Sequence, residues 1–177
     1  RTVPRFPKAP SAPVWLPRPR AVFEGRLDAE VGCEPRLTED DMDPVLGVRT
    51  RTAACSAGGI QVTMILVDAR AGEYSVELGV KAILERAQKN LGSSGATHVS
   101  PRSSFERVSG RATSLFRIDL LSRDGRPHTL RGRALAEGSD AGFYMTVYPS
   151  DDLPRLQQAE QALATFDLLP ERSVGRP

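Results

Sequence analysis

Apolar residues recur at helical spacing in the stretch "EYSVELGVKAILERAQKNLG", residues 73–92. The stripe consists of Val76, Val80, Ile83, Leu84, Ala87 and Leu91. Gly92 is expected to end this helix, because glycine readily adopts the left-handed conformation that follows a helix C-terminus. Gly79 inside it costs about 1 kcal/mol relative to alanine, which indicates close packing at that position.

A shorter apolar stripe follows near the C-terminus. Asp151 and Asp152 suit a helix N-terminus, where negative charge is favourable, and Pro154 is tolerated in the first turn. Apolar residues then recur on one face, at Leu156, Ala159, Leu163 and Phe166. The pattern predicts a second amphipathic helix that docks on a sheet built by the strands before it.

Alternating apolar and polar residues predict strands elsewhere. "VLGVRTRTAAC" and "IQVTMILVD" flank the turn "SAGG" and form a hairpin, and the second of them becomes apolar on both faces, as an interior strand does. "AVFEGRL" and its continuation to Cys33 are expected to form an edge strand. The acidic stretch "EPRLTEDDMDP" is expected to be a loop. "SSGATHVSPRSSFERVSG" is expected to be a polar connection that holds at most one short strand, around Phe105–Val108.

A three-strand meander is expected after this connection, with its first turn at "RDGR" and its third strand at "FYMTVYP". A two-residue turn would set apolar residues opposite arginines. A three-residue loop with Gly125 left-handed at a bulge sets Ile118 opposite Leu130 and Phe116 opposite Gly132, so we choose this register. The opposite face then carries Arg117 beside Arg131.

The element order predicts an α+β fold: an antiparallel sheet of about five to seven strands with two main helices packed on it, an α/β/α sandwich. Residues 19–170 are expected to form a single domain. Residues 171–177 are expected to be a disordered tail. Residues 1–18 are expected to be a proline-rich, basic, flexible linker, because six prolines fall within the first 19 residues. The alternative for this segment is a proline-rich ligand for a partner or the cell wall.

This architecture resembles the PsbP-like (Mog/PsbP) fold of bacterial secreted proteins and lipoproteins. The resemblance lies in the hairpin, the mid-chain helix, the meander and a closing helix that ends in "ATFDLL", and it covers about residues 21–169. It implies an α/β/α sandwich and a protein that binds or assists rather than catalyses. The group has no shared active site, so no site residue can be transferred to this chain.

The charge distribution argues against binding of nucleic acid. Five of the 24 basic residues and none of the 22 acidic residues lie within the first 20 positions, so a basic tail precedes a mildly acidic body. No apolar run approaches the roughly 20 residues that a membrane-spanning helix needs. The chain begins at Arg1 without an initiator methionine, and we expect that an export signal preceded it.

Cys33 and Cys55 lie 22 positions apart in segments expected to be strands or strand ends. They form no C-x-x-C motif and cannot complete a structural zinc site. In an exported protein they would form one disulfide, and in a cytoplasmic protein they would be two buried thiols. We expect a periplasmic, cell-surface or secreted bacterial protein, with a cytoplasmic location as the alternative.

The residues that carry chemistry are few, and we expect no catalytic, cofactor or metal site. His98 and His128 are isolated from each other, and no G-x-S-x-G motif occurs. "DDMDP" lacks the ligand spacing of a calcium loop, and "SAGG" joins two strands rather than a strand and a helix, as a phosphate-binding loop would.

A candidate anion-binding or partner-binding face comprises Arg117, Arg131 and Arg133, and the alternative is that these arginines pair with Asp119 on a half-exposed sheet. We therefore expect a non-enzymatic monomer that binds a protein partner at the cell envelope, in an accessory, immunity or host-contact role, with membrane attachment through an upstream anchor. The alternatives are a cytoplasmic effector chaperone and a small hydrolase with an unrecognised site.

Overall fold

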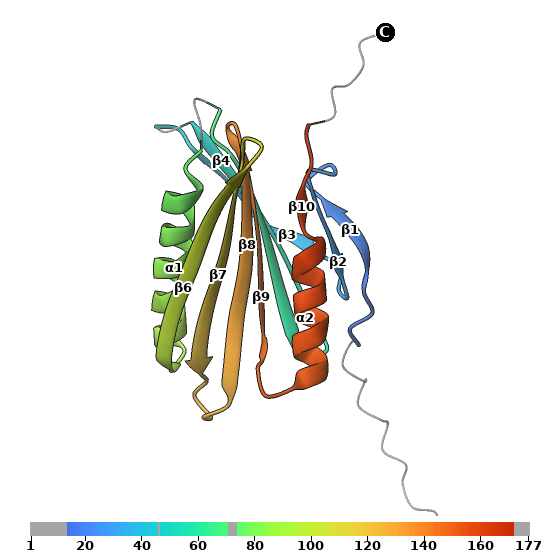
Figure 1. The fold of residues 1–177 in the computed structure, drawn as a ribbon, viewed down its shortest axis with the longest axis vertical. Coiled ribbons are helices and arrows are strands. Elements are labelled where there is room, and N and C mark those ends of the chain that lie inside the picture. Colours follow the sequence, from blue (N-terminus) through green and yellow to red (C-terminus); the bar gives the residue numbers. More distant parts are fainter. Residues whose placement is uncertain (1–13, 46, 71–73, 172–177) are drawn as a thin grey trace, which may run out of the picture.

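The computed structural model describes residues 14–45, 47–70 and 74–171. Most of the chain lies in one antiparallel sheet with the strand order β3-β4-β5-β9-β8-β7-β6 (Figure 1). Its strands are β3 (Arg36–Asp43), β4 (Val48–Ala57), β5 (Ile60–Asp68), β6 (Thr97–Val108), β7 (Arg111–Leu121), β8 (Pro127–Glu137) and β9 (Asp140–Pro149). The two strands at its edges, β3 and β6, are far apart in the sequence.

A second, three-stranded sheet has the order β1-β2-β10. Its strands are β1 (Arg18–Val22), β2 (Leu27–Val31) and β10 (Asp167–Leu168). In β2, Leu27, Ala29 and Val31 are buried and alternate with half-buried polar residues, so one face of this strand faces the protein core.

The two helices lie on opposite sides of the large sheet (Figure 1). Helix α1 (Val76–Ser93) packs against β6, β7 and β8, and helix α2 (Leu153–Thr165) packs against β9, β8 and β2. Successive residues of β9 show the separation: Phe143 belongs to the core beneath α1, and Tyr144 belongs to the core beneath α2. Both predicted apolar stripes contact these two cores, which confirms the two helices.

The predicted α/β/α sandwich is wrong. Strands make up 53% of the described residues and helices 20%, and the strands form two sheets rather than one. The segment expected to be an edge strand, from Ala21 to Cys33, instead forms the end of β1 and the whole of β2 in the small sheet. That sheet shares one side of the large sheet with α2, so a helix alone does not cover this side.

Two segments expected to be loops are strands. The acidic stretch 36–43 is β3, and the polar connection is the 12-residue strand β6. Both are edge strands with mostly exposed side chains, so they lack the apolar alternation by which sequence patterns indicate strands. An ion pair links β3 to β4 instead: the Asp40 carboxylate Oδ2 of β3 lies 2.9 Å from the Arg49 guanidinium Nη2 of β4.

Several local predictions are confirmed. The β7–β8 register pairs Ile118 with Leu130 and Phe116 with Gly132, and Gly125 has a φ of 82°. A side chain added at Gly79 would collide with the Tyr74 hydroxyl, which explains the glycine. The predicted end at Gly92 is wrong by one residue, because α1 continues to Ser93.

The structure describes only part of the predicted N-terminal linker and of the predicted C-terminal tail. Residues 1–13 of the predicted linker and residues 172–177 of the predicted tail lie outside the described residues. Within the remainder of the predicted linker, Trp15 is only 4% exposed and belongs to the core beneath α2. The indole lies against Gly32, where any side chain would collide with it. The described part of the predicted linker is therefore anchored to the domain at Trp15, although Leu16 beside it is 60% exposed.

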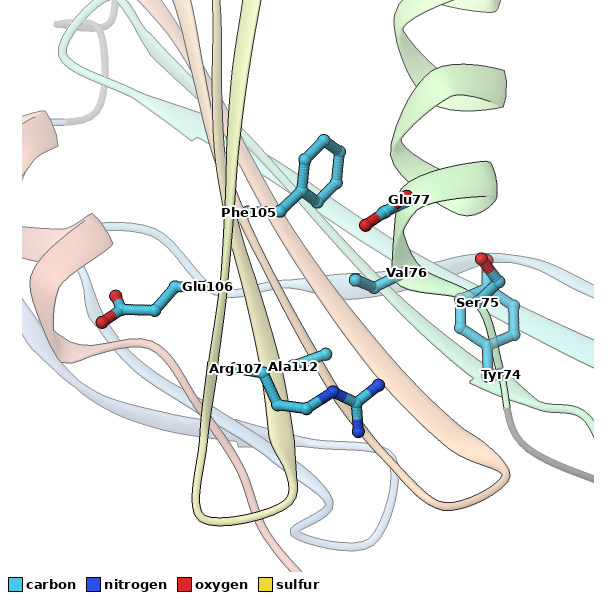
Figure 2. A pocket seen from close by; sticks show the side chains of 8 residues that line it. All are labelled: Tyr74, Ser75, Val76, Glu77, Phe105, Glu106, Arg107 and Ala112. Atoms are coloured by element: carbon cyan, nitrogen blue, oxygen red, sulfur yellow. The ribbon is translucent and has the colours of Figure 1, made fainter.

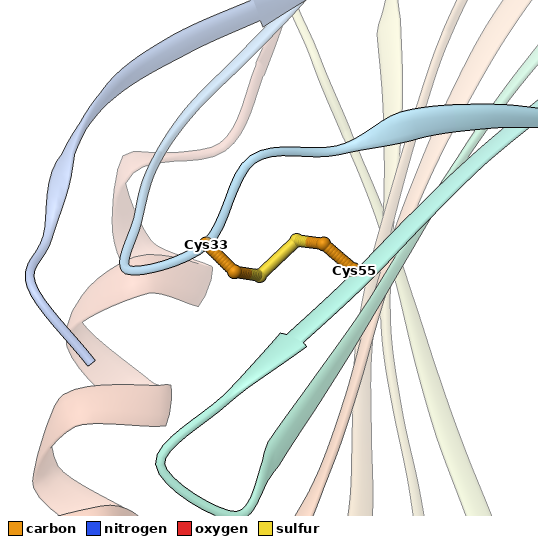
Figure 3. The surroundings of a disulfide bond; sticks show 2 residues. All are labelled: Cys33 and Cys55. Carbon is orange, nitrogen blue, oxygen red and sulfur yellow. A yellow bond between two sulfur atoms is a disulfide. The ribbon is translucent and has the colours of Figure 1, made fainter. Parts of the chain in front are cut away.

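One disulfide joins the two sheets. It links Cys33, just after β2, to Cys55 in β4, with the two Cα atoms 5.8 Å apart (Figure 3). The prediction of this bond is confirmed. Among the described residues, no helix is long and apolar enough to span a membrane.

Candidate functional site

The edge of β6 exposes backbone hydrogen-bonding groups. β6 and β7 are joined by the two-residue turn Ser109–Gly110, whose φ angles of 50° and 77° are those of a type I′ hairpin. The closing pair of such a turn exchanges two hydrogen bonds, and the hydrogen-bonded pairs then recur at every second residue. Arg102, Ser104 and Glu106 therefore bond to β7.

The residues between them point their backbone groups away from β7. These include Ser103 and Phe105, whose N–H and C=O groups face outward. Pro101 also belongs to this set, but as a proline it offers only its C=O group to the outer side. Within the described residues, the backbone groups of Ser103 and Phe105 have no partner across this edge. Twelve residues long and last in the sheet, β6 is open to pairing with another strand.

A groove runs between this edge strand and α1. One hollow, of about 380 Å³, lies at the start of the helix, where Tyr74, Val76 and Glu77 face Phe105 and Ala112 (Figure 2). A second hollow, of about 410 Å³, continues along the helix. Because both hollows are lined by Glu77 and Phe105, we describe them together as the α1–β6 groove.

The groove combines apolar surface with charges at its rim. Leu78 of α1 is 68% exposed and Phe105 of β6 is 43% exposed, and both line the second hollow. Glu77, Lys81 and Glu85 stand beside them on the helix. Figure 2 shows Phe105 directed toward α1, whereas Glu106 points to the opposite face of the sheet. This alternation places Pro101, Ser103 and Phe105 of β6 along the groove.

At the head of the groove, Tyr74 is anchored in the core. Its ring packs edge-on against Phe143, with ring centroids 6.2 Å apart. Burial raises the pKa of the Tyr74 hydroxyl above its ordinary value of 10.0, so the phenol stays neutral at physiological pH. This residue therefore supplies an apolar wall and a hydrogen-bonding group, and carries no charge.

The opposite face of β6 and β7 carries an ion-pair cluster centred on Asp119. Arg102 of β6 donates to this carboxylate at 3.0 Å and Arg117 donates at 2.9 Å. Burial raises the pKa of Asp119, but hydrogen bonds from Arg117 and Thr129 outweigh it, and the net pKa lies below 3.8. Glu106, on the same face, has no ion pair among the described residues.

The three predicted site arginines do not converge. Arg117 and Arg131 are cross-strand partners, as the register predicts, but Arg131 donates to Glu160 of α2 at 3.2 Å. Arg133 donates to the Phe166 carbonyl at 3.0 Å and so caps the C-terminus of α2. The surface hollow beside Arg117 and Arg131 includes Arg102, to which the sequence assigns no role, and excludes Arg133.

The other candidate groups lie apart from the groove. His128 Nδ1 lies 3.1 Å from the Arg126 carbonyl, and the side chain of His98 is outside the described part of the structure. Asp40 of the acidic stretch pairs with Arg49. At the "SAGG" turn, the Gly58 carbonyl accepts a hydrogen bond from Arg155. No group of three metal-ligating side chains occurs among the described residues.

These positions lie outside the β6 edge and the α1–β6 groove, which we take as the candidate site. The resemblance to the PsbP-like family stays a prediction. Comparison of the chain with protein-family models and with curated proteins gave no match.

Proposed function

We propose that this protein is an exported binding domain that captures an extended polypeptide segment of a protein partner at the β6 edge. The partner segment would lie beside β6 as an additional strand, with alternate side chains in the α1–β6 groove. Its role would be recognition at the cell envelope or surface, and no chemical step is assigned to it.

The observation that supports this proposal is the outward-facing backbone of Ser103 and Phe105 beside an apolar groove. In strand addition, main-chain hydrogen bonds supply affinity, and pockets for alternate side chains supply specificity. Both components occur together at β6. A groove without an open strand, or an open strand without a groove, would offer only one of them.

The disulfide supports the proposed location. A Cys33–Cys55 bond fits an extracellular or periplasmic protein, because cytoplasmic thiols are normally kept reduced. We propose a bacterial periplasmic or cell-surface location on this basis. The disulfide lies on β4, away from β6, so it would stabilise the domain without taking part in binding.

Display of random peptides on phage tests the proposed site, with the protein immobilised at low density. We expect enriched peptides to bind the wild type and to protect the amides of Ser103 and Phe105 from hydrogen exchange. Ser103→Pro should abolish binding, because it removes one outward N–H while leaving the ladder to β7 intact.

Phe105→Ser tests the groove component, and Leu37→Ser on β3 is its matched control, since Leu37 is 60% exposed on the opposite edge. We expect the first substitution to weaken binding and the second to leave it unchanged. Enriched peptides that bind Ser103→Pro as well as the wild type would refute the proposal, and so would a failure to enrich any peptide.

A further inference from the structure

We infer that the segment added to β6 is β6 of a second copy of this chain, paired antiparallel about a two-fold axis at Ser104. This inference rests on the proposed function, because it names the partner of that same edge. It departs from the monomer expected from the sequence. The pairing would join two large sheets into one continuous sheet.

The outward backbone groups restrict the possible registers. Residues with outward N–H and C=O groups must face one another, so Ser103 and Phe105 must pair with residues of the same set. An axis at Ser104 sets Ser103 of each copy opposite Phe105 of the other. Each of these two pairs exchanges two backbone hydrogen bonds, so the groups that are open in the single chain gain partners.

Charge selects among these registers. With the axis at Ser104, Arg102 of each copy lies opposite Glu106 of the other, which forms two ion pairs between unlike charges. An axis at Phe105 would place Glu106 opposite Ser104, and an axis at Glu106 would set two carboxylates against each other. An axis at Ser103 would leave Glu106 opposite Ser100. Only the Ser104 axis gives Glu106, which has no described ion pair, a cationic partner.

Side-chain size agrees with the same register. Phe105 lies on the α1 side of the sheet and would sit beside the small side chain of Ser103 in the other copy. The α1 helices of both copies would then stand on the same side of the joined sheet, flanking the two Phe105 rings. The exposed apolar surface of Phe105 would be reduced, which favours association.

The other edge of the sheet would limit assembly to two copies. After β6 pairs with β6, the free edges of the joined sheet are both β3, which carries Glu39, Asp40, Asp41 and Asp43. Two such edges repel each other, so they would not pair further. The interface uses the same patch on both copies and closes on itself, which produces a dimer.

Sedimentation equilibrium of charge variants tests this pairing. Arg102→Glu and Glu106→Arg each replace two attractive pairs by two repulsive ones, so each should weaken the dimer about tenfold or more. The double variant Arg102→Glu/Glu106→Arg restores unlike pairs and should dimerise like the wild type. A mixture of the two single variants should form a heterodimer, because the remaining charges are complementary. Glu39→Arg on β3 is the control and should not weaken the β6 dimer.

Ser104→Cys provides a second test, in which the proposed dimer is detected by a covalent cross-link rather than by the loss of association in a variant. Two residues facing across the axis in a non-hydrogen-bonded pair have Cα atoms about 4.5 Å apart, within the range of a disulfide. We expect a covalent dimer under oxidising conditions, whereas Thr38→Cys on β3 should give none. Ser103→Pro should reduce both the cross-link and the non-covalent dimer.

The inference would be overturned by a wild type that is monomeric at its highest soluble concentration, by a dimer that Ser103→Pro leaves intact, or by single variants that do not form a heterodimer. A monomer that still binds displayed peptides at β6 would overturn only this inference, and the proposed function would stand. A β6 dimer that binds no peptide at low density would support self-pairing and refute capture of other chains.

Discussion

The two edges of the large sheet, β3 and β6, differ in how charged side chains are arranged along the strand. β3 is exposed along nearly its whole length and carries four carboxylates, so two copies of it repel each other. β6 carries Arg102 and Glu106 at positions that become partners when the strand pairs with itself. In the proposed pairing the two edges differ in which charges meet: unlike charges meet across β6, whereas carboxylates meet across β3.

The structure supports these edges differently. Beside β3, strand β4 is linked by the Cys33–Cys55 disulfide to the chain just after β2. Beside β6, helix α1 covers one side of the sheet through side-chain packing. The β3 side is thus held in part by a covalent bond, whereas the β6 side depends on its apolar core. Substitutions that remove either the disulfide or part of the apolar core measure how much each contributes to the free energy of unfolding.

The largest effect is expected from the core beneath α1. Phe116 of β7 is 2% exposed and lies against Gly132 of β8. Phe116→Ala should lower the free energy of unfolding by about 3–5 kcal/mol, because it leaves a cavity. Leu37→Ala on β3 is the matched control and should change it by less than about 0.5 kcal/mol. Urea denaturation measures the free energy of unfolding of both variants. Similar losses in the two variants would contradict the claim that the β6 side, but not the β3 edge, depends on an apolar core.

Removal of the disulfide should have the next largest effect. Cys33→Ser/Cys55→Ser opens a loop of 22 residues and should lower the free energy of unfolding by about 3 kcal/mol. Because the bond lies away from β6, the dissociation constant of the β6 dimer should stay unchanged while the variant remains folded. Urea denaturation and sedimentation equilibrium measure the two quantities. A dimer lost together with the disulfide would show that the two edges are coupled.

A smaller effect is expected at Gly79, where α1 begins to line the groove. Alanine normally stabilises a helix relative to glycine, but its methyl group here would collide with the Tyr74 hydroxyl. Gly79→Ala should therefore lower the free energy of unfolding by about 1–2 kcal/mol. Tyr74→Phe should recover part of this loss in the double variant, which a thermal denaturation cycle measures. Additive effects of the two substitutions would refute the contact.

Sequence patterns predicted the elements that bury a regular apolar face. The register of β7 and β8 follows from matching Ile118 with Leu130, and both helices follow from their stripes. The second sheet could not be predicted this way. Leu27, Ala29 and Val31 indicate a half-buried strand, but its neighbour β10 is only two residues long, and the paired residues lie 139 and 141 positions apart in the sequence.

The candidate site was missed because its main strand is exposed. Only a short part of β6 was predicted, since its polar residues resemble those of a loop. A usable signal was present in the Ser109–Gly110 pair, which is typical of a two-residue hairpin turn and precedes the alternating strand β7. Recognition of this turn would have placed Arg102 beside Arg117 and completed the Asp119 cluster.

The smallest change in the free energy of unfolding is expected at Asp119, beside the β6 edge. Its dependence on pH can be compared with that of a carboxylate on the β3 edge. The pKa of Asp119 is lower in the folded protein than its ordinary value of 3.8, so the ionised carboxylate stabilises the fold. This contribution is present above pH 3.8 and is lost as the pH falls through the pKa of the folded state. Asp119→Asn should therefore cost about 1 kcal/mol or less at neutral pH and almost nothing in strong acid.

Asp40 of β3 is the matched site. A hydrogen bond from Arg49 lowers the pKa of Asp40 too, but the Asp40 side chain is 40% exposed against 32% for Asp119. Asp40→Asn should therefore change stability less than Asp119→Asn. Urea denaturation of both variants at neutral and acidic pH measures the difference. Asp119→Asn also releases Arg102 from an intramolecular partner, so it should strengthen the β6 dimer slightly while it weakens the fold. A weaker dimer would show that Asp119 holds Arg102 in position for Glu106 rather than competing with it.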